Sequence, residues 1–456
     1  MSFDRSLPPP PAAVRPFRFG RWESPRLEGG PRIMVLREPG VPLVHLEIVL
    51  GIGADRDPVD RRGLTALGAG LLDEGTAGLD ALAIAGTVEQ LGASLETAAD
   101  WDGVYVAISS LSEHLPALLE LGAEIALRPS LPAGELERLR RLRLAELAHR
   151  ASQPDFVAGV HAVGLVYGPD HPYGASLLGT AEGVAAIDAG EVRAWHAARA
   201  RPELTTLVAV GDTSAEEIVA LAREHFAGWP GGAAALPPRP PEPPAAPSRR
   251  VLVVDRPGAD QTELRIARIG PARGAPEYLA ARLANLLLGG KFTSRLNLNL
   301  RERLGITYGV HSTLGGRRGR GPFSVSCALD TEAAGRGVGE ILAEMDRMAS
   351  APPPAEELED GKSYLTGTFP YRLQSLDGLA DHLATVAIYD RPDDYFDSLP
   401  GRIASLTAED VARSAADLLR TDDLAIVAVG PAARLARQLE PFGALEVRSD
   451  PASPSS

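Results

Sequence analysis

The chain has 456 residues, of which 45% are hydrophobic and 23% are charged, and its formal net charge is −14. This length suffices for two or three domains with cores of their own, and the acidic charge argues against a general binder of nucleic acids or anionic membranes. The first residues contain no apolar signal segment and no run approaches about 18 apolar residues, so we expect a cytoplasmic protein without membrane contact.

The elements of the first half follow a proline-rich start. Residues 1–28 have no periodic pattern, which predicts an extended or disordered arm. Beyond it, patterns of period two and of helical period alternate along the chain. We expect strands at 32–37, 44–51, 94–98 and 104–110, and helices at 63–74, 81–92, 115–126 and 133–150.

A proline-rich linker divides the chain. The segment 233–250 contains so much proline that neither a helix nor a central strand can form there. The predicted organisation is therefore an arm, a first domain, a linker, a second domain and a tail, with boundaries at 1–28, 29–232, 233–250, 251–447 and 448–456.

The two domains carry a hidden repeat. VAVG occurs at 208–211 and again at 427–430, and the same shift sets 104–110 over 323–329. It also carries Val184, Ile187 and Val192, expected on one helix before the strand, onto Ile403, Leu406 and Val411, while a slightly smaller shift lays 64–72 over 279–287. We infer a tandem duplication of one α+β domain, each copy a mixed β-sheet with helices packed mainly on one face.

Cys327 is the single cysteine, which excludes an intrachain disulfide and any zinc site built from several cysteines. It lies in FSVSCAL (323–329), an alternating pattern typical of a strand, so we expect a buried, inert thiol. His161, His171 and His196 have spacings that match no compact metal motif, and we expect no metal role for them.

The segment GLTALGAGLLDEGT (63–76) resembles the metal-binding helix of the pitrilysin family of zinc peptidases (inverzincins). In that family the helix carries His-x-x-Glu-His, in which two imidazoles hold zinc and the glutamate is the general base. The motif positions fall here on Ala66, Ala69 and Gly70, none of which can bind a metal or move a proton. The resemblance implies that Glu146 stands at the position of the third zinc ligand, but without the two histidines that would share the metal. The alternative interpretation of Glu146 is a surface charge on a helix rich in Arg and Glu.

Two further segments support the resemblance. YGPDHPYGASLLGT (167–180) is similar to the His-Pro-Tyr-Gly loop of the family, and SRLNLNLRERLGITYG (294–309) is similar to the signature of its second domain. The resemblance implies that Arg301 and Tyr308 contact substrate: the phenol can donate a hydrogen bond to the carbonyl oxygen that gains negative charge, and the guanidinium can hold a carbonyl or carboxylate. By spacing alone this pair would be a weak signal. We expect Arg301 at the end of a helix and Tyr308 on the following strand, both at one rim.

The glycine-rich basic segment GGRRGRG (315–321) allows two interpretations. One is a mobile hairpin tip solvated by its charges, and the other is a flexible flap that steers acidic peptide segments. It is not a phosphate-binding loop, because it lacks the Gly-Lys-Ser/Thr ending and a following helix.

Together, a missing metal motif and a retained Arg/Tyr pair indicate a subunit that is inactive alone. The chain resembles the non-zinc subunit of bacterial heterodimers similar to the mitochondrial processing peptidase. The resemblance implies half of a clam-shaped chamber, a zinc-binding partner subunit, no cofactor on this chain, and unstructured peptides as substrates. The alternative is a catalytically dead peptide-binding or structural subunit. A third possibility, a peptidase acting alone by another mechanism, has no supporting constellation of residues.

Overall fold

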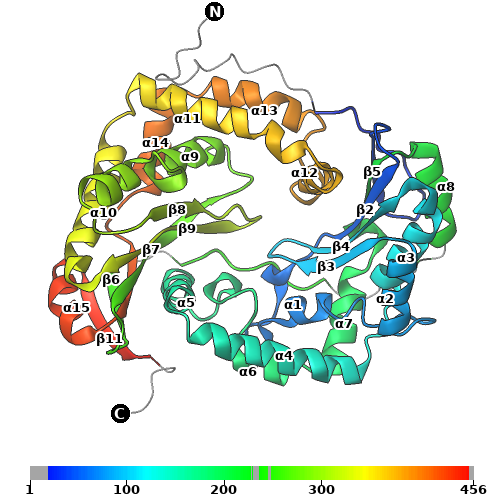
Figure 1. Cartoon of the computed structure of the whole chain (residues 1–456), viewed down its shortest axis with the longest axis horizontal. Coiled ribbons are helices and arrows are strands. Elements are labelled where there is room, and N and C mark those ends of the chain that lie inside the picture. Colours follow the sequence, from blue (N-terminus) through cyan, green and yellow to red (C-terminus); the bar gives the residue numbers. More distant parts are fainter. Residues whose placement is uncertain (1–18, 227–228, 230–235, 245–247, 451–456) are drawn as a thin grey trace, which may run out of the picture.

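The computed structural model describes residues 19–226, 229, 236–244 and 248–450, and it shows two α+β halves side by side (Figure 1). Residues 1–18 of the expected arm, parts of the linker and residues 451–456 of the expected tail lie outside the described residues. In the described ranges, no helix is long and apolar enough to cross a membrane. The domain boundaries given above stay a prediction.

The first half is built on a five-stranded mixed sheet in the order β1-β5-β2-β4-β3. β1 and β5 are parallel, and every other neighbouring pair is antiparallel. Its strands are β1 (Arg32–Arg37), β2 (Leu43–Leu50), β3 (Ser94–Ala99), β4 (Val104–Leu111) and β5 (Thr205–Gly211).

The second half repeats this topology. Its sheet has the order β11-β6-β10-β7-β9-β8, which matches the first sheet strand for strand once the edge strand β11 is set aside. The parallel pair β6–β10 stands where β1–β5 stands in the first half. The predicted duplication of one mixed-sheet α+β domain is therefore confirmed. The strands are β6 (Arg250–Asp255), β7 (Gln261–Ala272), β8 (Val310–Leu314), β9 (Arg320–Asp330), β10 (Ala425–Gly430) and β11 (Ala444–Ser449).

Helices surround both sheets. Those of the first half are α1 (Leu64–Ala69), α2 (Ala81–Gln90), α3 (Leu115–Leu127), α4 (Ala133–Ala151), α5 (Pro154–Tyr167), α6 (Ala181–Ala186), α7 (Ala189–Arg199) and α8 (Ala215–His225). Those of the second are α9 (Tyr278–Asn285), α10 (Ala334–Ser350), α11 (Ala355–Thr368), α12 (Leu376–Ile388), α13 (Tyr395–Ala404), α14 (Ala408–Leu418) and α15 (Ala432–Leu439).

Two expected helices differ from the structure. The helix expected at 63–74 ends at Ala69, and tighter turns follow it, in which the N–H groups of Leu71 and Leu72 donate to the carbonyls of Gly68 and Ala69. The helix expected to carry Val184 and Val192 is divided into α6 and α7. The Asp188 side chain caps α7 in a reciprocal capping box with Glu191, which starts a new helix at that point.

The halves exchange one helix each. α5, from the first half, packs on β7 and β10 of the second sheet, and α12, from the second half, packs on β5 and β2 of the first sheet. The apolar side of β1 and β5, with Met34 and Val208, consequently belongs to the same core cluster as the second half. Helices of its own half cover the opposite face of each sheet.

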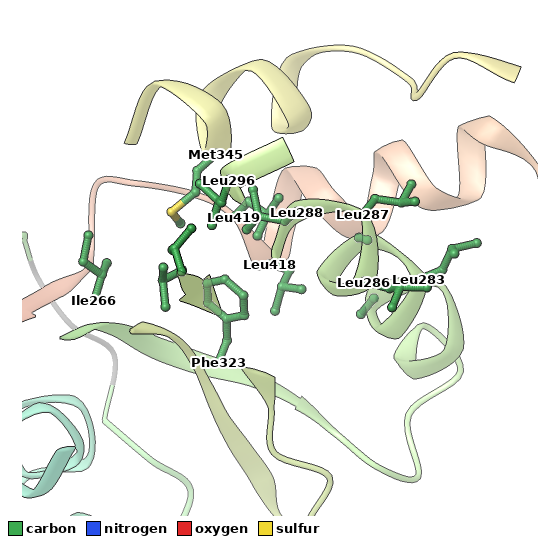
Figure 2. Packing of buried hydrophobic residues seen from close by; sticks show 14 of the residues in the cluster. Ile266, Leu283, Leu286, Leu287, Leu288, Leu296, Phe323, Met345, Leu418 and Leu419 are labelled. Carbon is green, nitrogen blue, oxygen red and sulfur yellow. The ribbon is translucent and has the colours of Figure 1, made fainter. Parts of the chain in front are cut away.

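The second core is the larger one. Leucines of α9 and of the wide turn Leu286–Gly290 meet Phe323 of β9 and Met345 of α10 (Figure 2). The buried thiol of Cys327 belongs to the same cluster, and burial raises its pKa to about 12. A thiolate is therefore disfavoured there, as expected for an inert cysteine.

Candidate functional site

The helix α1 occupies the place of the metal motif. Asp57 holds its first turn by accepting hydrogen bonds from the Thr65 backbone N–H (2.9 Å) and the Thr65 hydroxyl (2.5 Å). Arg199 donates to the same hydroxyl at 3.1 Å and lies 3.5 Å from the Asp57 carboxylate. The start of the helix is thus fixed by buried polar groups, although its motif positions carry no reactive side chain.

The residues at the motif positions do not fit a zinc ion. Ala66 and Ala69 offer methyl groups and Gly70 a hydrogen, and within the described ranges no group of three or more His, Cys, Asp or Glu side chains could hold a metal. Gly70 faces Leu139 of α4, two helical turns before Glu146 on that helix. Glu146 itself pairs with Arg150 at 3.1 Å and Arg143 at 3.7 Å. This is the ordinary surface role considered for Glu146, and we derive no zinc chemistry from this chain.

Arg301 lies in the wide helical turn Asn297–Arg303. Its guanidinium carbon stands 4.3 Å from the ring centre of Phe292, a contact of the cation–π type. Its nearest carboxylate is that of the neighbouring Glu302 at 3.6 Å, and the side chain is 35% exposed. Arg301 therefore presents a positioned guanidinium with room for an incoming acceptor. Sequence reasoning missed Phe292, which is 65% exposed and directly follows the GGK turn.

Tyr308 lies in the loop between that turn and β8, because β8 begins at Val310; the expectation that Tyr308 is on the strand was wrong. Gly305 turns the chain with a φ of +61°, a conformation that favours glycine. Asn297 then holds the loop by hydrogen bonds with both the N–H and the C=O of Val310, and the Thr307 hydroxyl donates to Ala328.

This arrangement fixes the backbone of Tyr308 and leaves its phenol free. The side chain is 91% exposed. In the described part of the chain, no hydrogen bond or ring contact joins Tyr308 to Arg301. The two groups are carried by one short, well-anchored segment, but each faces outward on its own.

The basic segment 315–321 is neither a mobile tip nor a free flap. It closes the β8–β9 hairpin and contacts the other half: the Arg318 backbone N–H donates to Asp102 at 3.0 Å, and the Arg318 guanidinium donates to the Gly51 carbonyl at 3.2 Å. The Arg317 guanidinium lies 4.4 Å from the Trp101 ring centre and 4.3 Å from that of Tyr173. Both interpretations were wrong because these arginines find acceptors and aromatic faces in the first half.

Two of the three histidines, His171 and His196, form hydrogen bonds with structural partners. The two ring nitrogens of His171 contact the Tyr173 N–H and the Pro241 carbonyl, which attaches the linker to the loop 171–174. His196 contacts the Ala126 carbonyl at 2.9 Å. Burial lowers the pKa of His161, His171 and His196, so each favours its neutral form.

Comparison with known families gives two matches. Residues 32–164 match the family described as "Insulinase (Peptidase family M16)", and residues 186–365 match "Peptidase M16 inactive domain". The first match contains α1 and the second contains Arg301 and Tyr308.

Individual relatives and a solved structure support the same family assignment. An uncharacterized zinc protease of Mycobacterium tuberculosis is 30% identical over 332 residues, 71% of this chain and 72% of the relative. A non-peptidase homolog of Helicobacter pylori is 22% identical, over 74% of this chain and 77% of the relative. The crystal structure of a peptidase M16 inactive domain from Pseudomonas fluorescens superimposes with a TM-score of 0.82 at 28% identity, covering 90% of this chain and 98% of that one.

Proposed function

Because the chain belongs to the insulinase family of peptidases (peptidase family M16), we propose that it is the subunit of a two-subunit zinc peptidase that holds no zinc itself. It would close a chamber with a zinc-binding partner of the same family and present Arg301 and Tyr308 to a peptide bound there. The substrates would be unstructured peptides. In this proposal the zinc ion belongs to the partner, and this chain needs no cofactor.

One observation carries the proposal. The positions that would hold zinc are Ala66, Ala69 and Gly70, while Tyr308 is 91% exposed and the Arg301 side chain 35% exposed on a segment whose backbone is fixed. A tyrosine that is 91% exposed buries little apolar surface and adds little to folding, which favours a role in contact with another molecule.

The two side chains suit a peptide backbone. The Tyr308 hydroxyl can donate a hydrogen bond to a peptide carbonyl oxygen as negative charge develops on it, and a single donor of this kind commonly contributes about 10²–10³ in rate. The Arg301 guanidinium can donate two parallel hydrogen bonds to a second carbonyl or to a terminal carboxylate. Stacking on Phe292 limits the motion of the guanidinium before substrate arrives.

The alternative is a peptide-binding or structural subunit without a role in hydrolysis. The Helicobacter relative described as a non-peptidase homolog is the observation that favours it. Both functions use the same fold, and they differ in whether Arg301 and Tyr308 change the rate of cleavage.

The decisive experiment measures cleavage of a quenched unstructured peptide by this chain alone, and then with a relative from the same genome that carries His-x-x-Glu-His. We expect activity only in the mixture, with loss on chelation. Arg301→Ala or Tyr308→Phe should lower kcat by about 10²–10³ while the two subunits still co-elute.

Matched controls are Tyr371→Phe and Arg413→Ala, since Tyr371 is 73% exposed and the Arg413 side chain is also 73% exposed, and neither belongs to the segment 292–308. These variants should leave the rate unchanged. No stimulation and no co-elution with any such relative would exclude the shared site and leave the binding or structural role. Equal cleavage rates for Tyr308→Phe, Arg301→Ala and the control variants would also exclude the shared site.

A further inference from the structure

A cavity lies between the two halves. It has a volume of about 370 Å³, with the first sheet as one wall and α12 of the second half as the other. Figure 1 shows α12 beside β2 and β5 of the first sheet. Four carboxylates line the cavity, Glu47 of β2, Glu96 of β3, Asp100 and, from α12, Asp381, and one guanidinium, that of Arg273, faces them.

Glu47 is buried and lacks a partner. It is 4% exposed, it lines the cavity, and among the described residues its Oε2 atom has no hydrogen-bond donor. An unsatisfied buried carboxylate oxygen costs on the order of 1–3 kcal/mol, so a donor arriving in the cavity would be bound favourably. The sequence signal was present but not used: β2 reads LVHLEIVL, an apolar strand with an acid in its middle.

The other acids also lack a cation. Within the described residues none of the four forms an ion pair within 4.0 Å; Asp100 instead accepts hydrogen bonds from the Tyr105 hydroxyl and two backbone N–H groups. Arg273 is turned to the Tyr389 ring, with its guanidinium carbon 4.4 Å from the ring centre. Arg273 is thus the one cation that lines the cavity among the described residues, and the four acids outnumber it wherever they are ionised.

The spacing and the remaining wall exclude a metal and favour an alkyl chain. No group of three or more of these acids, in the described structure, is close enough to hold a metal ion. Ala98, Ala107, Ala384 and Ile388 provide apolar wall between the acids. The methylene groups of a ligand can pack on this apolar wall, while its charged nitrogen atoms lie beside the acids.

The cavity continues along the sheet. A neighbouring cavity of about 780 Å³ shares Glu96 and Ala107 with it and adds Asp377, one helical turn before Asp381 on α12. His45 lines this second part, and burial lowers its pKa, so it does not add positive charge at neutral pH. Acids thus recur along the path, as the charges of a linear polyamine or of neighbouring lysines would require.

We propose that this groove is a site for a linear chain bearing two or more ammonium groups, with one ammonium group donating to Glu47 between the two halves. The source of the chain is a free polyamine or the lysine side chains of a peptide. The site lies within this chain and needs no partner subunit, so it stands independently of the function proposed above.

The pH dependence follows from the carboxyl group. Burial, with the charges of Asp381 and Asp100, raises the pKa of Glu47 to about 8, so below that pH Glu47 is mostly protonated and lacks the negative charge that pairs with an ammonium group. Burial also raises the pKa of Asp100 and Asp381. Burial favours the neutral phenols of Tyr105 and Tyr389 by raising their pKa, so these phenols do not titrate in the range of interest. Binding should strengthen as pH rises and should release a proton.

The test is calorimetric titration of the full chain with 1,4-diaminobutane and spermidine at pH 6 and pH 9, at constant ionic strength. A second arm uses an unstructured peptide with two lysines and its counterpart with glutamines. We expect binding at least about tenfold tighter at pH 9 than at pH 6, with proton release. Binding by the free amines identifies a small ligand, whereas binding by the lysine peptide alone identifies a peptide.

The variant Glu47→Gln keeps the shape of the side chain and removes its charge. It should weaken binding at pH 9 about tenfold or more and abolish the pH dependence, and Asp381→Asn on the opposite wall should weaken it independently. Glu120→Gln, an equal charge change on the exposed side of α3, should bind as the unaltered chain does. No binding of any probe at pH 9, or equal binding by the unaltered chain and Glu47→Gln, would overturn the proposal.

Discussion

At the scale of single residues, the polar network beneath α1 is the best-defined feature of the first half. Asp57 and Arg199 are both nearly fully buried, and Arg199 also donates to the carbonyl oxygens of Ile52 and Gly53. Burial raises the pKa of Asp57 to about 6 despite this neighbour. The network holds the helix start, so its contribution is to folding and not to chemistry.

Arg199→Met should therefore destabilise the protein by about 3–5 kcal/mol at pH 8, because it leaves the Asp57 carboxylate buried without a cation. The loss should be smaller at pH 5, where Asp57 takes up a proton more easily, and adding Asp57→Asn should restore part of it. Chemical unfolding at the two pH values measures this. An equal loss at both, with no recovery in the double variant, would contradict the assigned roles.

The sequence indicated Arg301 and Tyr308 only through family resemblance, and their roles stay a prediction. The family itself, and the α+β fold with two tandem copies, are confirmed. The surroundings of Glu47 and Arg317 could not be predicted from periodicity, because the groups that face them, Asp381 for Glu47 and Trp101 for Arg317, come from the other half, far along the chain. Local pattern reports which side of a strand is apolar, but it does not report which distant helix covers that side.

At the scale of elements, the β8–β9 hairpin is a clasp between the halves. Asp102, which is 2% exposed, accepts from the Arg318 backbone N–H and, at 2.6 Å, from the Tyr389 hydroxyl at the end of α12. One carboxylate thus holds both a hairpin and a helix of the second half. The sequence showed a basic glycine-rich loop. The loop is ordered by hydrogen-bond acceptors that lie more than 200 residues away in the sequence, which a local pattern does not reveal.

Asp102→Ala should leave both donors without their acceptor and destabilise the protein by about 2–5 kcal/mol. Limited proteolysis should then cut within 315–321, which the clasp protects in the unaltered chain. Asp170→Ala, at an exposed loop position, serves as the control and should change neither the free energy of unfolding nor the cutting pattern. Unaltered protection in Asp102→Ala would show that the hairpin is held by other contacts.

At the scale of the whole molecule, the exchanged helices make the halves mutually dependent. α5 buries Val157, Ala162 and Val166 in a cluster with the second sheet, and the first sheet buries Met34 and Val208 beneath α12. Neither half can satisfy its own apolar surface. The linker adds two attachments, the hydrogen bonds that the Pro237 and Pro241 carbonyls accept from Arg56 and His171.

Residues 19–235 or 236–450 expressed alone should consequently aggregate or lack cooperative unfolding, whereas the two pieces produced together should co-purify in equal amounts. Size exclusion and thermal unfolding distinguish the cases. Either piece alone giving a monomer with a sharp transition would show that the exchange contributes little to stability.

The exchange also orders events during synthesis. The first sheet is complete when β5 ends at Gly211, but the helix that covers its second face ends at Ile388. At about 5–20 residues per second, roughly 10–35 s pass between these points on the ribosome. During that interval the nascent first half exposes an apolar face that only its own unfinished remainder can cover, so this protein should engage chaperones while it is still being translated.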